Sequence, residues 1–143
     1  MNLVRLDPEQ LAALADALEA ASLPTSDLEA PDRQFYRFED AIGMVGYGGL
    51  EGRGPDRLLR SVVVTTERRG TGLGGILLGQ LEHAAADGGA TSLYLLTTTA
   101  EGFFRRAGYM PVERTRAPEP IANSAEFRSL CPASAAFLFK RIC

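Results

Sequence analysis

Arg69-Gly70-Thr71-Gly72-Leu73-Gly74 is the stretch that decides how this chain folds. The run 58–64, which ends in three consecutive valines, precedes it and is typical of a buried strand, and residues 73–86 follow it with leucines at helical spacing. Alternate glycines leave backbone N–H groups uncovered, and a helix N-terminus adds the positive end of its dipole. The stretch therefore predicts a strand–turn–helix unit that binds a phosphate-type anion.

Two common phosphate-binding motifs do not fit this turn. A Walker A loop needs Gly-Lys and then Ser or Thr after four spacer residues, and the chain has neither in that place. A Rossmann fingerprint has an acidic residue about 20 positions further on, where this chain has Tyr94-Leu95-Leu96. The motif that needs an explanation is therefore Arg-Gly-x-Gly-x-Gly.

Length and composition predict a single domain over residues 1–143. A net charge of −3 gives no basic field, so we expect no nucleic-acid partner. No apolar run approaches the roughly 20 residues of a membrane span, and the N-terminus lacks the apolar core of a secretory signal, which favours a cytoplasmic protein without a membrane partner. Cys131, Cys143 and the one histidine, His83, are too few for a disulfide framework or a His/Cys metal cluster, so we expect no metal.

The rest of the chain alternates between short strands and helices. Asp7-Pro8 is a helix start, and Leu11, Leu14 and Leu18 then recur at helical spacing. Strands are expected over 34–39, 44–50, 58–64, 91–96, 110–112 and 136–140, and further helices over 73–86 and 100–107. Strands before, helix–strand–helix in the middle and strands after predict a mixed α/β sheet.

A second motif is Thr97-Thr98-Thr99-Ala100-Glu101-Gly102-Phe103-Phe104-Arg105-Arg106-Ala107-Gly108-Tyr109. From Ala100 to Tyr109 it resembles an element of the GNAT family of N-acetyltransferases, Asn-x-x-Ala-x-x-aromatic-Tyr-x-x-x-Gly-Phe. The glycine turn likewise resembles that family's pyrophosphate loop. The resemblance implies the α/β (α+β) GNAT fold, a mixed, mostly antiparallel, splayed sheet flanked by helices, with acetyl-CoA as cosubstrate.

A narrower likeness involves residues 58–64, 95–100 and 127–135. These segments look like the small GNAT subgroup encoded with bacterial arsenic-resistance genes. This likeness implies acetylation of amino-acid-type amines, with organoarsenical or phosphinic amino-acid analogues as candidate substrates. Cys131 and Cys143 are a poor site for trivalent arsenic, which prefers several thiolates, and a buried small side chain is the usual role of a free cysteine.

The resemblance also implies which residues hold acetyl-CoA. Backbone N–H groups of the glycine turn are expected to bind the pyrophosphate, with Arg69 or Arg68 as an added contact. A backbone N–H where the central strand splays is expected to bind the thioester oxyanion. The expected cofactor-binding residues are Val62, Val63, Val64, Arg69, Gly70, Thr71, Gly72, Leu73, Gly74, Thr98, Ala100, Phe103 and Phe104.

Acetyl transfer to an ammonium needs a proton acceptor, for which Glu51 at the end of the glycine-rich strand is the first candidate. The alternative interpretation is an exposed turn glutamate, and Glu39 is a weaker candidate for the base. Many GNAT enzymes have a Tyr acid where this chain has Phe104, which cannot donate a proton. The acid is then Tyr94, Thr98, Ser61, Tyr47 or a water, or else the thiolate leaves unassisted.

Arg60 and Ser61 are the candidate substrate-binding residues. Arg60 stands inside an apolar strand, where a guanidinium is costly unless it is paired. It is either a clamp for a substrate carboxylate or the partner of a structural acid such as Asp40 or Glu51.

Together these observations predict an acetyl-CoA-dependent N-acetyltransferase that acts on the amine of a small, amino-acid-like substrate, with a role in arsenic resistance. The alternative is a non-catalytic acyl-CoA sensor or interaction module on the same fold, which the missing Tyr at Phe104 favours. The family likeness also implies a homodimer.

Overall fold

Residues 2–142, which the computed structural model describes, form one open seven-stranded sheet in the order β1-β2-β3-β4-β5-β7-β6. The strands are β1 (Asn2–Arg5), β2 (Arg33–Glu39), β3 (Met44–Glu51), β4 (Asp56–Val64), β5 (Ser92–Thr97), β6 (Met110–Pro111) and β7 (Ala136–Arg141). The helices are α1 (Leu11–Ala20), α2 (Leu73–Asp87), α3 (Glu101–Arg106) and α4 (Glu119–Ala122), with a π-helical turn η4 (Glu126–Leu130).

β4 and β5 are the two neighbours that run parallel, while the other neighbouring pairs are antiparallel. Their ladder runs from the pair Asp56–Ser92 to the pair Leu58–Tyr94. Beyond Leu58 the two strands part, although β4 continues to Val64 and β5 to Thr97. The sheet is therefore splayed at its centre, and the expected mixed, mostly antiparallel architecture is confirmed.

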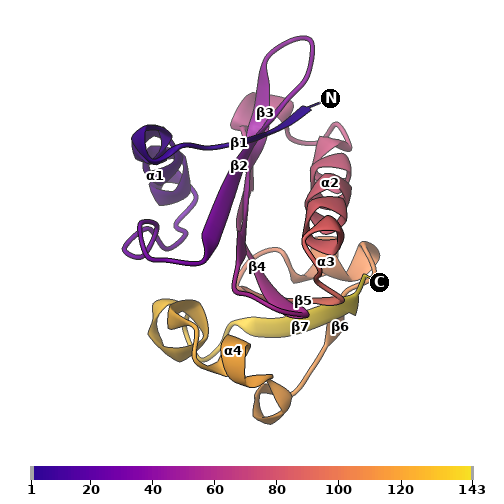
Figure 1. Ribbon diagram of the computed structural model, residues 1–143. Coiled ribbons are helices and arrows are strands. Elements are labelled where there is room, and N and C mark those ends of the chain that lie inside the picture. Colours follow the sequence, from indigo (N-terminus) through magenta and orange to yellow (C-terminus); the bar gives the residue numbers. More distant parts are fainter. Residues whose placement is uncertain (1, 143) are drawn as a thin grey trace.

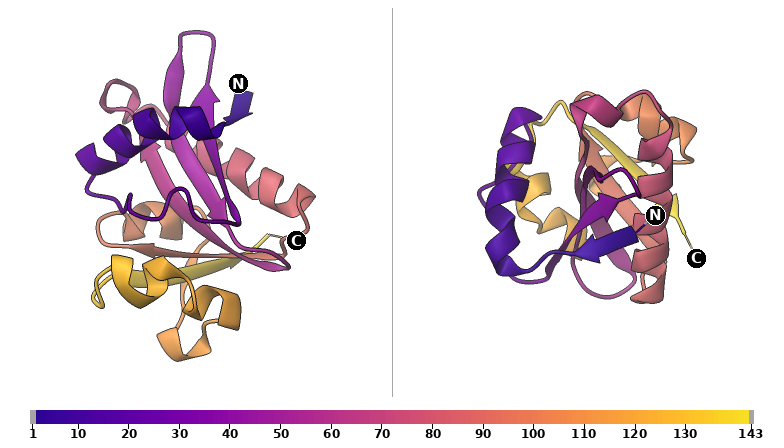
Figure 2. Two further views of the ribbon diagram at one scale, coloured as in Figure 1. Left: turned by 60° about the vertical axis from the view of Figure 1, so that its left-hand side comes forward. Right: turned by 90° about the horizontal axis from the view of Figure 1, so that it is seen from above.

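Helices cover both faces of the sheet (Figure 1). Seen from above, α1 lies on one side of the sheet and α2 on the other (Figure 2). Apolar side chains of α2 and α3 pack on one face of the sheet, and Leu14 and Leu18 of α1 pack with Phe35 and Tyr47 on the other face. The segment between β6 and β7 adds a third cluster, in which Ile121 packs against β4 and β7.

Glycines in β3 let α2 approach the sheet closely. A Cβ at Gly48 would stand 2.3 Å from a methyl carbon of Leu81 in α2, so only hydrogen fits there. Leu81 is fully buried in this contact. The glycine-rich composition of the strand therefore has a packing reason.

A β-bulge interrupts β4 at its centre. Tyr47 pairs with Val63 and Gly49 pairs with Arg60, so Ser61 and Val62 together face Gly48. Ser61 has a φ of 59°, which is uncommon for a residue with a side chain. The bulge bends β4 at the point where it has left β5.

The expected elements around the glycine turn are confirmed to within about two residues, which is the usual uncertainty of element ends. The N-terminal helix begins with a 3₁₀ turn (Pro8–Gln10) before α1, at the helix start expected from Asp7-Pro8, and Asp7 and Gln10 form a capping box. The edge strand β1 and the helical pieces α4 and η4 were not predicted. Within residues 2–142, no helix combines the length and the apolar character needed to cross a membrane.

Candidate functional site

A cavity of about 780 Å³ opens where β4 and β5 part. Its walls come from five parts of the chain: β4, the glycine turn, the residues from the end of β5 into α3, the loop after α1, and the segment that contains η4. The wall residues include Ser22, Leu23, Pro24, Arg60, Ser61, Val62, Val63, Val64, Arg69, Gly70, Gly72, Gly74, Thr98, Ala100, Phe103, Phe104, Glu126, Leu130 and Cys131.

The glycine turn leaves room for a ligand at its backbone. Gly70 and Gly72 have φ values of 76° and 79°, in the left-handed region that favours glycine. No atom stands within 4 Å of where a Cβ would be at either position, so the turn is open on that side. Gly72 is also the N-cap of α2, whose first N–H groups have no partner inside the helix. This arrangement suits a pyrophosphate, as the sequence predicted for acetyl-CoA.

The two arginines before the turn are held in different ways. Arg68 donates to the carboxylate of Asp40 at the β2–β3 hairpin, which lowers the pKa of Asp40 to about 2. Nε of Arg69 donates to the carbonyl oxygen of Val64 at 2.9 Å, and its side chain is exposed. Arg69 therefore stays beside the turn, while Arg68 ties the turn to the hairpin.

Beyond β5, the chain turns into α3 along the opposite wall. Thr97 Oγ1 accepts a hydrogen bond from the N–H of Ala100 at 3.0 Å, which fixes the turn that leads into this short helix. Phe103 and Phe104 follow, with ring centroids 5.1 Å apart in an edge-on arrangement. A Cβ at Gly74 would lie 3.3 Å from the Phe103 ring, so the glycine lets α2 and α3 meet.

Phe104 is buried and packs edge-on against Tyr109, so it offers the cavity an apolar surface. Of the four hydroxyls considered as its replacement, Ser61 and Thr98 line the cavity. Tyr47 lies in the core beneath α1, and Tyr94 is stacked between Phe137 and Phe139. The structure therefore places two of the four at the site.

Arg60 lies at the centre of a buried ion-pair network. Its Nη1 is 2.6 Å from Asp27 and 2.9 Å from Glu51, and its Nε is 3.2 Å from Oε2 of Glu126. Arg33 also contacts Asp27 at 2.9 Å. Burial opposes the ionisation of Asp27, but hydrogen bonds from the two arginines outweigh burial and lower its pKa to about 2. The sequence-based pairing of Arg60 with Glu51 is confirmed, whereas Asp40 pairs with Arg68 instead.

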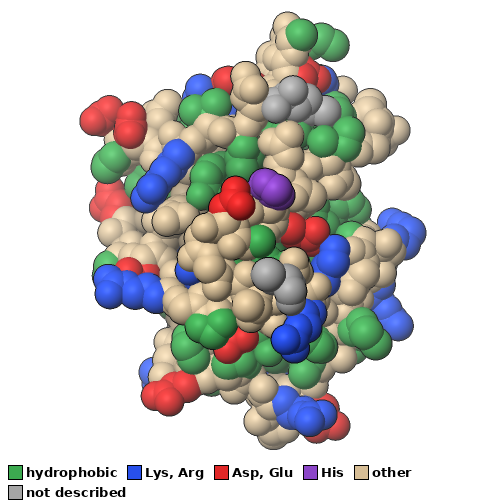
Figure 3. Space-filling view, turned by 45° about the vertical axis from the view of Figure 1, so that its right-hand side comes forward, with side chains coloured by type: hydrophobic (Ala, Val, Ile, Leu, Met, Phe, Trp, Pro, Cys, Tyr) green, Lys and Arg blue, Asp and Glu red, His purple; other side chains and the backbone are tan. Residues whose placement is uncertain are grey.

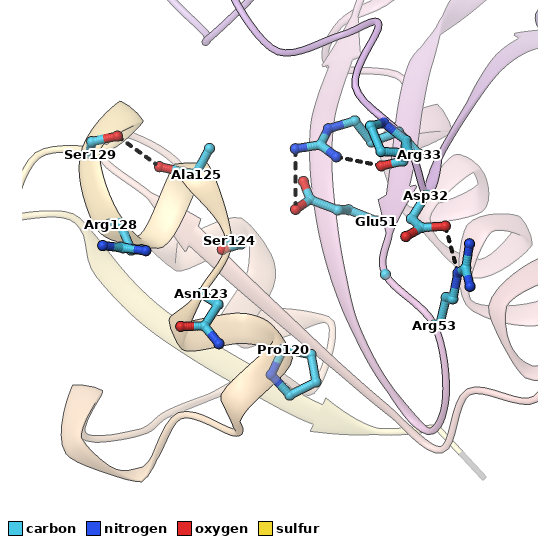
Figure 4. A pocket seen from close by; sticks show the side chains of 12 residues that line it. Asp32, Arg33, Glu51, Arg53, Pro120, Asn123, Ser124, Ala125, Arg128 and Ser129 are labelled. Carbon is cyan, nitrogen blue, oxygen red and sulfur yellow. Dashed lines mark hydrogen bonds and ion pairs between the residues drawn. The ribbon is translucent and has the colours of Figure 1, made fainter.

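Glu51 lies on the far side of this network from the β4–β5 gap. Its carboxylate is buried between Arg60 and Arg33, so it is not the exposed turn glutamate that one interpretation offered. It lines a second cavity, of about 820 Å³, which lies between the ends of β2 and β3 and the segment 120–129 (Figure 4). Glu39, the weaker candidate, forms an ion pair with Arg37 on the neighbouring stretch of β2. Neither carboxylate faces the β4–β5 gap.

Glu126, which the sequence did not suggest, does line that gap. It is only 3 % exposed. Burial raises the pKa of Glu126 to about 7, against the opposing effect of the Arg60 charge. Its neighbours along the chain, Ala125 and Phe127, make it a lone acid in a stretch without clear periodicity, which is a weak signal in sequence.

His83 and Cys131 differ in whether they lie at the cavity. His83 is exposed on α2, 3.6 Å from Asp87, and is seen as the purple side chain in Figure 3. Cys131 lines the cavity, and burial raises its pKa to about 11, so it is a protonated thiol. Cys143 lies outside the described residues. Within the described part, no group of three or more His, Cys, Asp and Glu side chains is arranged to hold a metal ion.

With this geometry in place, comparison with known proteins defines the class. The family model of the acetyltransferase (GNAT) domain matches residues 31–111, from β2 to β6. The matched stretch includes the bulge, the glycine turn and α3. The chain therefore belongs to the GNAT acetyltransferase family, whose enzymes use acetyl-CoA as cosubstrate.

Curated relatives match somewhat less than half of the chain. The uncharacterized N-acetyltransferase YjcF of Bacillus subtilis is 40% identical over 65 residues, which are 45% of this chain and 40% of that protein. The uncharacterized N-acetyltransferase CT2212 of Chlorobaculum tepidum is 33% identical over 63 residues, 44% of this chain and 40% of that protein. Each match thus spans less than half of the relative's length.

The fold itself is shared along the whole chain. The crystal structure of Rv2747 from Mycobacterium tuberculosis, in complex with CoA and NLQ, superposes with a TM-score of 0.77. The superposition covers 99% of both chains at 20% identity. At this identity the match shows a common fold, including the elements that form the cavity.

Proposed function

We propose that this chain transfers the acetyl group of acetyl-CoA to the amine of a small molecule, in the cavity between β4 and β5. One observation carries the proposal: the open glycine turn, the bulge in β4 and a buried carboxylate all border the same cavity. The turn would bind the pyrophosphate of acetyl-CoA, and the strand beside the bulge would bind the oxyanion that forms on the thioester. The carboxylate would accept a proton from the attacking amine. The alternative, an acyl-CoA sensor, needs only the glycine turn.

Acetyl-CoA would supply an acetyl group activated as a thioester. The N–H groups of the turn, residues 69–74, would hold its pyrophosphate, with the Arg69 guanidinium beside them. Thr98, Ala100, Phe103 and Phe104 would border the pantetheine arm, with the two aromatic rings excluding water from it.

The parting of β4 from β5, beside the bulge, gives β4 a way to bind the developing oxyanion. Within a sheet, the backbone N–H groups donate hydrogen bonds to neighbouring strands and are not free to bind a ligand. At Val62, Val63 and Val64 the strand has parted from β5, so N–H groups on that side can point at the cavity. A donor fixed in this way before the reaction stabilises the transition state without further reorganisation.

The acceptor amine would enter between the loop after α1 and the segment that contains η4. Leu23, Pro24 and Leu130 give this end an apolar wall. Arg60 already contacts three carboxylates of the protein, and its side chain is fully buried. These contacts leave little room for Arg60 to bind a carboxylate of the substrate, so the geometry supports recognition of the amine more directly. The amino-acid-like substrate, the homodimer, the cytoplasmic location and the role in arsenic resistance are proposals that rest on sequence reasoning and resemblance.

Thiol release from acetyl-CoA, followed with Ellman's reagent over a panel of amines, tests the proposal. The panel should pair each amino acid or arsenical and phosphinic analogue with the matching amine that lacks the acid group. Release with at least one amine, with the acetylated product seen by mass spectrometry, is the expected result. Binding of acetyl-CoA without release for any amine would favour the sensor, and release with the acid-bearing member alone would show that a carboxylate is recognised.

A further inference from the structure

One buried carboxylate of the Arg60 network also lies in the wall of the β4–β5 cavity. Glu126 lies in the π-helical turn η4, and its side chain is 4% exposed. Yet it borders the gap between β4 and β5 together with Leu130 and Cys131. A carboxylate is costly to bury, so a site that keeps one at a ligand cavity suggests a chemical use.

Arg60 fixes Glu126 beside the bulge. Nε of Arg60 donates to Ser61 Oγ at 3.3 Å and lies 3.2 Å from Oε2 of Glu126. Both oxygens are therefore next to the same nitrogen, and Ser61 is the residue whose positive φ starts the bulge. The carboxylate is thus held close to the backbone that would bind the acetyl oxygen.

We propose that Glu126 accepts the proton of the acceptor ammonium. This inference rests on the proposed acetyl transfer. The N–H bond of the ammonium breaks and its proton moves to a carboxylate oxygen of Glu126. The freed lone pair forms the N–C bond to the acetyl carbon while the C–S bond breaks, and the sulfur leaves with a second proton from the nitrogen. Glu126 then returns its proton to solvent.

The other two carboxylates around Arg60 are placed less well for this step. Asp27 is held by Arg60 and Arg33 with its pKa lowered to about 2, so it is a poor proton acceptor. Glu51 borders the second cavity, on the other side of the network. Glu126 is the one member of this trio that lines the β4–β5 gap.

The electrostatic surroundings suit a base that works near neutral pH. Burial, the largest effect, together with the charges of Asp27 and Glu51 outweighs the charges of Arg60 and Arg33, so the pKa of Glu126 is raised to about 7. A proton acceptor must be ionised, so kcat/KM should rise with pH through about 7 and level off above it. Cys131, the remaining titratable neighbour, has its pKa raised to about 11 and stays neutral over that range.

The test compares Glu126→Gln with Glu51→Gln. Both variants remove one carboxylate from Arg60, so both disturb the network, but only one changes a group at the gap. For Glu126→Gln we expect kcat/KM to fall by about 100-fold or more. We also expect the rise of kcat/KM with pH near 7 to disappear in this variant. Its affinity for acetyl-CoA should be retained in a calorimetric titration. Glu51→Gln should keep the rise.

Three results would overturn the inference. They are a wild-type profile with no rise between about pH 6 and 8, an unchanged profile in Glu126→Gln, and loss of the rise in Glu51→Gln instead. The wild-type profile needs no variant, so the test stands even where Glu126→Gln fails to fold. Absence of turnover with any amine would contradict the proposed function itself, whereas turnover that is indifferent to Glu126 would contradict only its role as the base.

Discussion

At the scale of single residues, Arg60 connects segments that are far apart in sequence. Its three carboxylate partners come from the loop after α1, from β3 and from η4. Hydrogen bonds with Asp27 and Glu51 and the negative charges of Glu126 and Asp27 outweigh burial and raise the pKa of Arg60 above its usual value, so the side chain keeps its charge inside the protein. The network therefore holds both acceptor-side walls of the cavity against the bulged strand.

Asp27 should make folding depend on acid pH. Its pKa is lowered from 3.8 to about 2 in the folded protein, so its contribution is present above about pH 4 and is lost as the pH falls toward 2. We expect Asp27→Asn to be less stable than the wild type near neutral pH. Its free energy of unfolding should then change less between about pH 5 and 2.5, by about 1–2 kcal/mol. Urea unfolding at stepped pH measures this difference.

Asp32→Asn is the matched control, since Asp32 forms an exposed ion pair with Arg53, whose side chain is 83% exposed. We expect it to change stability by less than about 1 kcal/mol. Equal pH dependence in wild type and Asp27→Asn would show that the network does not hold this carboxylate as described.

Sequence reasoning reached part of this network. An arginine in an apolar strand indicated a buried partner, and Glu51 was named; it pairs with Leu58, two residues before Arg60 in β4. Asp27 and Glu126 stand 33 and 66 positions from Arg60 in segments without regular periodicity. Their approach depends on how loops pack, which local patterns do not encode.

At the scale of elements, alanine substitutions at two glycines test the close contact between α2 and β3. Gly48→Ala would place a methyl group 2.3 Å from Leu81, so either α2 or β3 must shift. We expect a loss of about 1–3 kcal/mol, typical of overpacking. Gly79→Ala, on α2 with open space around it, should instead gain up to about 1 kcal/mol from helix propensity. Thermal or urea unfolding of both variants checks this, and a neutral Gly48→Ala would contradict the close contact.

The elements that sequence predicted well are those with a strong repeating pattern. β4 has paired leucines and ends in three consecutive valines, and α2 has leucines at helical spacing after the glycine turn. β1 is a four-residue edge strand, and α4 and η4 span four and five residues. Such short pieces are stabilised by tertiary packing, here by Ile121 and Phe127 against β4 and β7, more than by local preference.

At the scale of the whole molecule, the site exists because two neighbouring strands at the centre of the sheet separate along most of their length. β4 and β5 are neighbours that pair only at their beginnings, and helices from both faces frame the gap between them (Figure 1). The glycine turn and α3 were placed correctly from sequence because both follow directly from strands that border the gap. The acceptor side of the cavity was not placed from sequence, because it is built from the loop after α1 and from η4, which lack a regular pattern.

The central claim is that acetyl-CoA binds in this gap on the glycine turn. A calorimetric titration of acetyl-CoA into the wild type, Gly72→Val and Gly79→Ala tests it most directly. A β-branched residue at a φ of 79° is strongly disfavoured, and its side chain would enter the open side of the turn. We expect one site per chain in the wild type and in Gly79→Ala, and affinity at least about 10-fold weaker in Gly72→Val, as follows from a cost of about 1–2 kcal/mol. Equal affinity in all three, or no binding to the wild type, would contradict the claim.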